Sequence, residues 1–351
     1  MKKVTVSAER TYEVVIDTDW VKEITPRLAN RARAAIIVSK EMRKRIPVLD
    51  SMECEVHYFE IPDGEEGKSA QTLLQVWDWL GAAGFTRSDL IIGIGGGATT
   101  DFAGYAAASW LRGLDWIAVP TTVAGMVDAS IGGKTAINSD YGKNLIGAFH
   151  SPIAVIIDVS WLPTLSDRDF AAGLAEVVKT GFIADAKILD LLSGTSIQDV
   201  RKNQNLITEL ISRSVQVKSD VVSEDFKESY AREALNYGHT LGHAIERDSN
   251  FSLKHGECVA IGMVFIAALQ KHLGTMSEND FSKHMKILTD LGLPVSYPRD
   301  SWEKVLSAMS LDKKARGKAL RFVTLDGIGK TARLENPDET ALMKAFEEVS
   351  S

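Results

Sequence analysis

The chain has 351 residues, of which 45% are apolar and 25% are charged, and its formal net charge is −7. These values are ordinary for a soluble enzyme, and the negative charge argues against a nucleic-acid partner, whose phosphates would require a basic excess. No apolar run approaches the roughly 18 residues of a membrane span, and the first ten residues lack the apolar segment of a secretory signal. The two cysteines, Cys54 and Cys258, form no C-x-x-C pair, which is typical of a reducing compartment. We therefore expect a cytoplasmic protein with neither a membrane nor a nucleic-acid partner.

Short apolar runs alternate with helical patterns in the first half of the chain. Residues 34–39, 90–94, 116–120 and 153–158 have the composition of buried strands, and residues 69–82 among them are amphipathic. This alternation predicts a parallel sheet with helices on its faces, as in a Rossmann-like domain.

The period of the apolar residues changes in the second half. From about residue 167 they mostly recur every three or four positions, which predicts helices. Such patterns cover residues 188–192, 206–222, 260–273 and 281–291, and one late strand is expected at 320–325.

The length exceeds what one hydrophobic core usually organises, so two domains are expected. We place an α/β domain at residues 1–160 and a mostly α-helical domain at residues 161–351. Two-domain enzymes commonly build the active site in the cleft between the domains, and we expect it there.

A glycine turn follows the second predicted strand. Residues 90–94 lead directly into Gly95-Gly96-Gly97 and then into a helix of small residues. Such a turn lets the backbone approach a pyrophosphate, but Thr100 stands where the third glycine of the G-x-G-x-x-G fingerprint would be, so a packing role stays open. Thr121 and Thr122, after the next strand, add two hydroxyls and favour phosphate binding.

Two lysines and an asparagine lie in small-residue turns farther along. Gly132-Gly133-Lys134-Thr135 is similar to the end of a Walker A motif, but Asp128 stands where its first glycine should be, which argues against an ATPase. Lys134, Lys143 and Asn144 instead favour a pocket for an anionic, hydroxyl-rich ligand.

Three of the seven histidines lie between positions 239 and 255. His239 and His243 are four residues apart, which places both on one face of a helix. A catalytic zinc site has three protein ligands, and Glu176 is a candidate for the carboxylate. Glu176 and Lys179 could form a solvated surface pair, yet the neighbours of Glu176 are almost all apolar or small. The residues alone leave open which histidines bind metal.

In order along the chain, these motifs make the sequence similar to the 3-dehydroquinate synthase family over roughly residues 58–330. The resemblance is carried by 62–66 with Lys68, 95–97 with Asp101, 112–113, 120–122, Asp128, 132–135, 142–147, 175–179, 236–246, 255–257 and 312–314.

The resemblance implies a cyclase of the shikimate pathway that depends on NAD and a divalent metal. Such an enzyme converts 3-deoxy-D-arabino-heptulosonate 7-phosphate into 3-dehydroquinate and phosphate without net redox. It implies Glu176, His239 and His255 as ligands of zinc, cobalt or iron, with His243 contacting the substrate. It also implies a homodimer in which Arg112 reaches the neighbour's site.

The resemblance implies two further sets of residues. Those that bind or act on the substrate are Lys134, Asn144, Lys179, Lys218, Arg232, Asn236, His243, Arg112 and one of Lys313 and Lys314, here taken as Lys314. Those that bind the cofactor are Asp63, Gly64, Glu65, Glu66, Gly67, Lys68, Gly96, Gly97, Ala98, Thr99, Thr100, Asp101, Thr121, Thr122, Asp128, Lys134, Lys143, Trp161, Leu162, Pro163 and Thr164. The departures from the family pattern at 97–101 and at Ser39-Lys40 concern contacts to the cofactor's ribose.

Three other functions are compatible with parts of the sequence. One is a related cyclase acting on sedoheptulose 7-phosphate or a hexose phosphate. Another is a metal-dependent polyol dehydrogenase, whose glycine loop usually continues Asp-x-Ala-Lys, whereas Gly104 stands here in place of the lysine. The third is a sugar-phosphate-binding regulator without turnover, which would need neither a metal site nor a hydride carrier.

Overall fold

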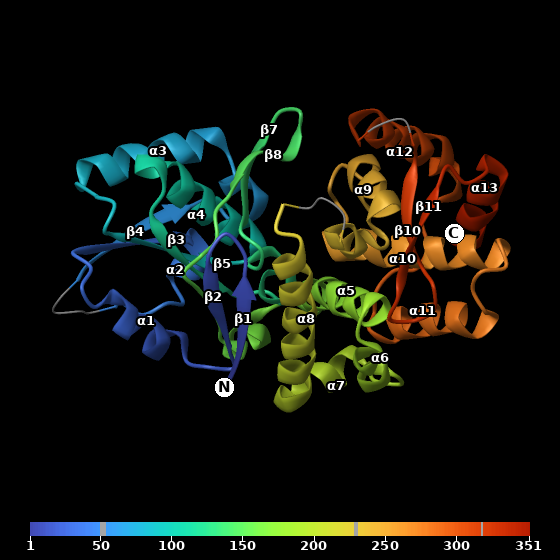
Figure 1. Cartoon of the computed structure of the whole chain (residues 1–351), viewed down its shortest axis with the longest axis horizontal. Helices are drawn as coiled ribbons and strands as arrows, with labels where there is room; N and C mark the ends of the chain where they lie inside the picture. Colours follow the sequence, from blue (N-terminus) through green and yellow to red (C-terminus); the bar gives the residue numbers. More distant parts are fainter. Residues whose placement is uncertain (50–53, 228–230, 317–318) are drawn as a thin grey trace. The chain divides into compact units, whose positions relative to one another are not determined.

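The computed structural model describes residues 1–49, 54–227, 231–316 and 319–351, with only the backbone at residues 231 and 311–316. The chain divides into two compact units (Figure 1). The first comprises Met1–Thr164 and Lys218–Lys227, and the second comprises Leu165–Val217 and Glu228–Ser351. The cleft expected between two domains stays a prediction, because the structure defines each unit separately.

A seven-stranded sheet organises the described residues of the first unit, in the order β1-β2-β9-β6-β5-β3-β4. Its strands are β1 (Lys2–Ser7), β2 (Thr11–Ile16), β3 (Arg33–Ser39), β4 (Glu55–Ile61), β5 (Leu90–Gly95), β6 (Asp115–Pro120) and β9 (Ala154–Ile157). All neighbours pair in parallel except β1 and β2, which are antiparallel. The parallel sheet is confirmed, with an antiparallel edge that the sequence analysis did not predict.

The central strands are buried on both faces, as their continuous apolar runs predict. Every residue of β5 and of β9 is buried. The helices of this unit are α1 (Trp20–Leu28), α2 (Lys40–Arg43), α3 (Ala70–Ala82) and α4 (Gly97–Ser109), with the short helices η1 (Gly64–Gly67), η2 (Trp110–Arg112), η3 (Gly125–Ala129) and η4 (Val159–Thr164).

Residues 134–149 form a β-hairpin, whereas the sequence was interpreted as small-residue turns. Strand β7 (Lys134–Ser139) pairs antiparallel with β8 (Gly142–Phe149), and Figure 1 shows the hairpin extending away from the sheet of its unit. Most of β8 is exposed, so its apolar residues do not mark a buried face in the sequence. The expectation of turns alone is therefore wrong.

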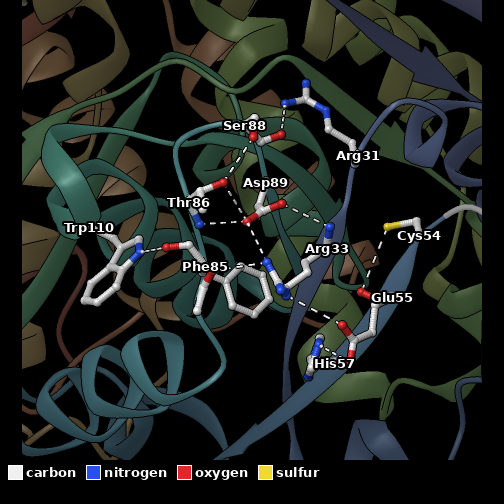
Figure 2. A network of polar contacts seen from close by, with 11 residues as sticks. Arg31, Arg33, Cys54, Glu55, His57, Phe85, Thr86, Ser88, Asp89 and Trp110 are labelled. Carbon is white, nitrogen blue, oxygen red and sulfur yellow. Dashed lines mark hydrogen bonds and ion pairs between the residues drawn. The ribbon is translucent and has the colours of Figure 1, made fainter.

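The amino ends of the central strands are tied together by a polar network around Asp89 (Figure 2). Asp89 is fully buried and accepts hydrogen bonds from the backbone N–H of Arg33 at 3.0 Å, from the N–H of Thr86 at 2.7 Å and from the Thr86 hydroxyl at 3.0 Å. Arg33 lies at the start of β3 and also approaches Glu55, at the start of β4. The network therefore ties together the amino-terminal ends of β3, β4 and β5.

The second unit is mostly helical, as predicted. Its helices are α5 (Asp167–Ile183), α6 (Ala186–Leu192), α7 (Ile197–Lys202), the first part of α8 (Gln204–Glu224), α9 (His239–Asp248), α10 (His255–His272), α11 (Glu278–Asp290), α12 (Trp302–Arg316) and α13 (Glu339–Glu348), with short helices η5 (Ala231–Asn236) and η6 (Arg299–Ser301). The predicted late strand is β10 (Arg321–Leu325), which pairs with the unpredicted β11 (Thr331–Glu335). Helix α10 is buried from Gly256 to Gln270 and forms the centre of this unit. None of the helices in the described ranges is long and apolar enough to cross a bilayer.

Candidate active site

Helix α5 brings a carboxylate into the interior of the second unit. All residues from Phe170 to Ile183 are buried, including Glu176 and Lys179, each 2% exposed. The Lys179 Nζ lies 2.5 Å from Glu176 Oε2, while Oε1 faces two imidazoles. The pair is therefore a buried one, and the solvated surface pair considered from the sequence is wrong.

His239 is the first residue of α9. Its Nδ1 lies 3.1 Å from the backbone carbonyl of Tyr237, which can only accept, so Nδ1 donates. The lone pair of Nε2 is then left facing Glu176 Oε1 at 3.6 Å. The local backbone thus orients His239 so that Nε2, the nitrogen that a metal would use, faces Glu176.

His255 is the first residue of α10, and it contacts two carboxylates. Its Nε2 lies 3.3 Å from Glu176 Oε1, and its Nδ1 lies 3.2 Å from Glu246 Oε2. A carboxylate behind a metal-binding histidine fixes the orientation of the ring and raises its basicity. Glu246, one helix turn after His243, supplies this carboxylate.

Glu176, His239 and His255 fit a divalent cation by distance. Each offers one ligand atom, and these atoms lie within 4.8 Å of one another. Ligands in a tetrahedral zinc shell, with bonds of about 2.0–2.1 Å, stand about 3.3–3.4 Å apart. The separations of 3.3 and 3.6 Å from Glu176 Oε1 to the two imidazoles are close to this value. Among the described residues, both buried Glu176 oxygens also lack a hydrogen bond of ordinary geometry, which suits an oxygen awaiting a cation.

The charges of the cluster favour an added positive charge beside Glu176. Burial alone would raise the pKa of Glu176, but Lys179 and the two histidines hold it well below its usual range. Burial and the Lys179 ammonium hold the pKa of His239 well below its usual range. Burial also opposes the charged form of His255, yet Glu176 and Glu246 outweigh it and raise the pKa of His255 to about 10. The two carboxylates around His255 thus favour a positive charge at this position.

A second triad, His243, Glu246 and His255, also has its ligand atoms within 4.8 Å. It shares His255 with the first, and the His243 ring centroid lies 5.3 Å from that of His239. Glu246 already contacts His255 Nδ1, the nitrogen that faces away from Glu176. This arrangement leaves half-buried His243 beside the first triad rather than within it.

Three other residues implied in substrate binding belong to the second unit. Arg232 is buried and Asn236 half-buried, both in η5, the short helix that precedes His239. Lys314 and its neighbour Lys313 lie within α12, but their side chains are outside the described residues.

In the first unit the glycine turn joins β5 to α4, as predicted. Gly96 caps α4 and contributes no side-chain oxygen to the first N–H groups of the helix, so these can reach a phosphate. A side chain at Gly97 would lie 2.9 Å from the Cβ of Ala129, so only glycine fits the close packing there. Thr121 donates its backbone N–H to Gly95, which places the threonine turn beside the glycine turn.

Lys68 links three of the predicted cofactor and substrate segments. It is 2% exposed, its Nζ lies 2.8 Å from Asp101 Oδ2 in α4, and it also donates to Asn144 Oδ1 in β8. Burial raises the pKa of Asp101 to about 6 in spite of the Lys68 charge. Segment 63–68, the start of α4 and the hairpin β7–β8 are thus held together by one ammonium.

The remaining predicted residues of this unit lie in three places. Lys218, in α8, is hydrogen-bonded to Asp128 in η3. Lys134 is exposed and Lys143 half-buried on the hairpin. Residues 161–164 lie in η4, where the Trp161 ring centroid is 6.2 Å from that of Trp20.

Arg112 is not near the glycine turn. It lies in η2, beyond the opposite end of α4, and a helix of 13 residues spans about 20 Å. Its side chain is exposed, and both Leu111 and Arg112 have positive φ, of 47° and 68°. Arg112 therefore does not join the other cofactor and substrate residues of its own first unit.

Glu246 and Tyr237 received no role from the sequence, although both lie inside the motif at residues 236–246. Glu246 is three residues after His243, so a carboxylate on the histidine face of α9 was a signal that could have been used. Tyr237 acts through its backbone carbonyl, which no residue type indicates.

Comparison with known proteins gives matches in both halves of the chain. Models of the N-terminal and C-terminal parts of 3-dehydroquinate synthase match residues 58–172 and 173–315. A 3-dehydroquinate synthase of Paenarthrobacter aurescens (strain TC1) is 45% identical over 350 residues, which cover 98% of this chain and 96% of that protein.

Two similar solved structures are sugar-phosphate cyclases or their relatives with cofactor and metal bound. A 2-epi-5-epi-valiolone synthase from Streptomyces hygroscopicus subsp. jinggangensis 5008, with NAD+ and Zn2+, has a TM-score of 0.90 and 27% identity, covering 99% of each chain. A 2-deoxy-scyllo-inosose synthase with carbaglucose-6-phosphate, NAD+ and Co2+ has a TM-score of 0.85 and 26% identity, covering 99% of this chain and 100% of the other.

Proposed function

The chain belongs to the 3-dehydroquinate synthase family, and on that premise we propose which of its residues carry the reaction. It is a phosphate-eliminating lyase of the shikimate pathway, and it uses NAD and a divalent metal. The reaction converts 3-deoxy-D-arabino-heptulosonate 7-phosphate into 3-dehydroquinate and phosphate. The single observation that supports the proposal most is the cluster of Glu176, His239 and His255, in which Glu176 and His239 are buried.

We assign the metal to Glu176 Oε1, His239 Nε2 and His255 Nε2, with the fourth position open to substrate. A divalent cation bound there would supply a Lewis acid for the substrate's hydroxyl oxygens. Lys179, with its Nζ on Glu176 Oε2, keeps the carboxylate oriented and adds a positive charge for an anionic substrate. Glu246 holds His255 with Nε2 toward Glu176.

We assign NAD to the glycine turn and its surroundings, at Asp63 to Lys68, Gly96 to Asp101, Thr121, Thr122, Asp128, Lys134, Lys143 and Trp161 to Thr164. Bound NAD would supply a hydride acceptor that is restored in each turnover. The N–H groups at the start of α4 suit its pyrophosphate. The shared ammonium of Lys68 fixes Asp101 at the same turn.

We assign the substrate to Lys134, Asn144, Lys179, Lys218, Arg232, Asn236, His243 and Lys314, with Arg112 supplied by a second copy of the chain. The many cations match a substrate that carries a carboxylate and a phosphate. The position of Arg112, beyond the far end of α4 and exposed, supports a role in a neighbour's site and hence a homodimer.

We also propose that residues 1–160 act as the NAD-binding domain and residues 161–351 as the metal- and substrate-binding domain. The division of the chain near residue 164 is consistent with this proposal, except that residues 218–227 group with the first unit. The two cysteines, both free and buried, suit a cytoplasmic enzyme.

The test is phosphate release from 3-deoxy-D-arabino-heptulosonate 7-phosphate by the purified protein, with and without NAD and a chelator, while absorbance at 340 nm is followed. We expect release that requires both NAD and metal and accumulates no NADH. If the protein released no phosphate from this substrate but turned over sedoheptulose 7-phosphate, the proposed substrate would be wrong. If the protein formed NADH from a polyol, the proposed reaction would be wrong and the protein would be a dehydrogenase.

A further inference from the structure

The second unit contains a buried histidine that the proposed reaction does not use. His284, in α11, has no exposed surface. Its ring stacks on Phe182, with ring centroids 3.5 Å apart and planes at 6°. Phe182 belongs to α5, the helix that carries Glu176. His284 therefore joins α11 to the helix of one proposed metal ligand.

The hydrogen bonds of His284 have a fixed direction. Its Nδ1 lies 2.7 Å from the backbone carbonyl of Asp280, which can only accept, so Nδ1 carries the proton. Burial lowers the pKa of His284 to about 4, so the ring is neutral at neutral pH. Its Nε2 therefore accepts from the hydroxyl of Tyr237, at 2.8 Å. The fully buried hydroxyl of Tyr237 thus has its donor bond satisfied by His284.

Tyr237 connects this pair to a metal ligand through its backbone. Its carbonyl accepts from His239 Nδ1 at 3.1 Å. The ring end of Tyr237 is held by His284, and its carbonyl end holds His239. The chain of bonds therefore runs from the Asp280 carbonyl through His284 and Tyr237 to His239.

The backbone after Tyr237 has little room to move. Gly238 has φ +79°, and a side chain there would lie 2.8 Å from the Val259 carbonyl oxygen in α10. A side chain at Gly262 would lie 1.9 Å from the carbonyl oxygen of Gly238. Residues 237–238 are thus packed closely against α10 and hydrogen-bonded to α11 through the Tyr237 hydroxyl.

We propose that His284 and Tyr237 are positioning residues for the metal site, because they hold the carbonyl that selects the His239 tautomer with Nε2 as the ligand atom. The proposal rests on the assignment of Glu176, His239 and His255 as ligands. Groups that orient a metal-binding histidine typically change metal affinity by about 10- to 100-fold. His284 acts through Tyr237, so we expect about a tenfold effect.

The experiment measures the zinc affinity of metal-free protein by competition with a chromophoric chelator, without substrate or NAD. His284→Phe keeps a ring against Phe182 but removes both nitrogens, and Tyr237→Phe removes only the hydroxyl. Each is expected to weaken zinc binding about tenfold. The double variant is expected to lose little more than either single variant, because both break one link. His284→Gln, which retains an acceptor, should recover part of the affinity.

The matched control is Leu288→Ala, one turn farther along α11 and equally buried. It should lower the unfolding midpoint by opening a cavity but leave zinc affinity within about twofold. Unchanged zinc affinity in Tyr237→Phe and His284→Phe, or an equal loss in Leu288→Ala, would reduce the pair to core packing and overturn the proposal.

A further variant distinguishes a failure of this proposal from a failure of the ligand assignment. His239→Ala should abolish tight zinc binding. If it does not, the ligand assignment itself is wrong and the positioning role fails with it. In cobalt-loaded protein, Tyr237→Phe should also shift the visible absorption bands, which report ligand geometry and do not respond to a loss of packing elsewhere.

Discussion

Asp89 in the first unit and Glu176 in the second are both buried carboxylates, but their surroundings are opposite. Asp89 accepts from two backbone N–H groups and a hydroxyl, all within 3.0 Å, with the Arg33 guanidinium near by (Figure 2). Glu176 has its oxygens among an ammonium and two imidazoles and makes no hydrogen bond of ordinary geometry within the described part of the chain.

On the proposed metal assignment, the difference separates a structural role from a chemical one. A carboxylate whose lone pairs are already used by fixed donors stabilises the strands it ties and has no capacity left for a ligand. A carboxylate held beside nitrogen ligands, with an oxygen left over, is costly unless a cation completes it. Burial alone therefore does not identify a functional acid, whereas the identity of its partners does.

The largest expected effect is that of Glu176→Gln. The amide lacks the charge that a divalent cation requires, so metal content should fall and turnover should drop by several orders of magnitude. Metal analysis of the purified variant, with the phosphate-release assay, measures both. The protein should remain folded by circular dichroism, and full activity with normal metal content would return Glu176 to a structural role like that of Asp89.

Lys179→Ala should cost about 10²- to 10³-fold in turnover, because it removes a positive charge from a desolvated site. The matched control is Lys187→Ala, on the exposed surface of α6, where the lysine pairs loosely with Asp190 at 3.9 Å. That variant should keep turnover within about twofold. A similar small change in Lys179→Ala would contradict the proposed role of its ammonium.

Asp89→Asn should reverse the pattern of Glu176→Gln. The amide NH₂ group of the variant would face the N–H and hydroxyl donors of Arg33 and Thr86, so at least one charge-assisted hydrogen bond would be lost. The unfolding free energy should therefore fall by about 2–4 kcal/mol. Urea unfolding measures the loss, and turnover at low temperature should stay normal. Asp190→Asn, on the surface, should change stability by less than about 0.5 kcal/mol. A loss of turnover in Asp89→Asn without a loss of stability would contradict the structural role.

The last expected effect, which is absent at neutral pH, is a pH dependence of stability that arises from His284. Its pKa is about 4 in the folded chain and about 6.5 when unfolded, so the unfolded chain binds the extra proton between these values. Stability should therefore fall by about 1.4 kcal/mol for each pH unit below about 6.5, until about pH 4. His284→Phe should remove this slope. If the unfolding free energies of the two proteins fell in parallel from pH 7 to pH 4, the prediction would be wrong.

Local patterns predicted much of the candidate site. The run from β5 through the glycine turn into α4 is encoded by adjacent residues, and the spacing of His239 and His243 depends only on a helix. The strand pair β1–β2 was also readable, since Val4 and Val6 alternate with polar neighbours, but the sequence analysis did not use that signal.

Contacts between distant residues could not be predicted in this way. Glu246 meets His255 across a helix end, and Tyr237 meets His284 from 47 positions away. The exposed apolar residues of β8, such as Leu145 and Ile146, also gave the hairpin no buried face to reveal it. Residue type and spacing report which face is buried, not which distant group lies against it.

One edge of the large sheet is protected by a segment from much later in the chain. The backbone N–H of Ser7 in β1 donates to the Ser223 hydroxyl at 3.0 Å, and the Ser219 hydroxyl donates to the Thr5 carbonyl at 2.8 Å. An isolated fragment of residues 1–164 would contain every strand of the sheet but lack this cover. Its exposed edge strand would be a template for pairing with other chains, so such a fragment would tend to self-associate.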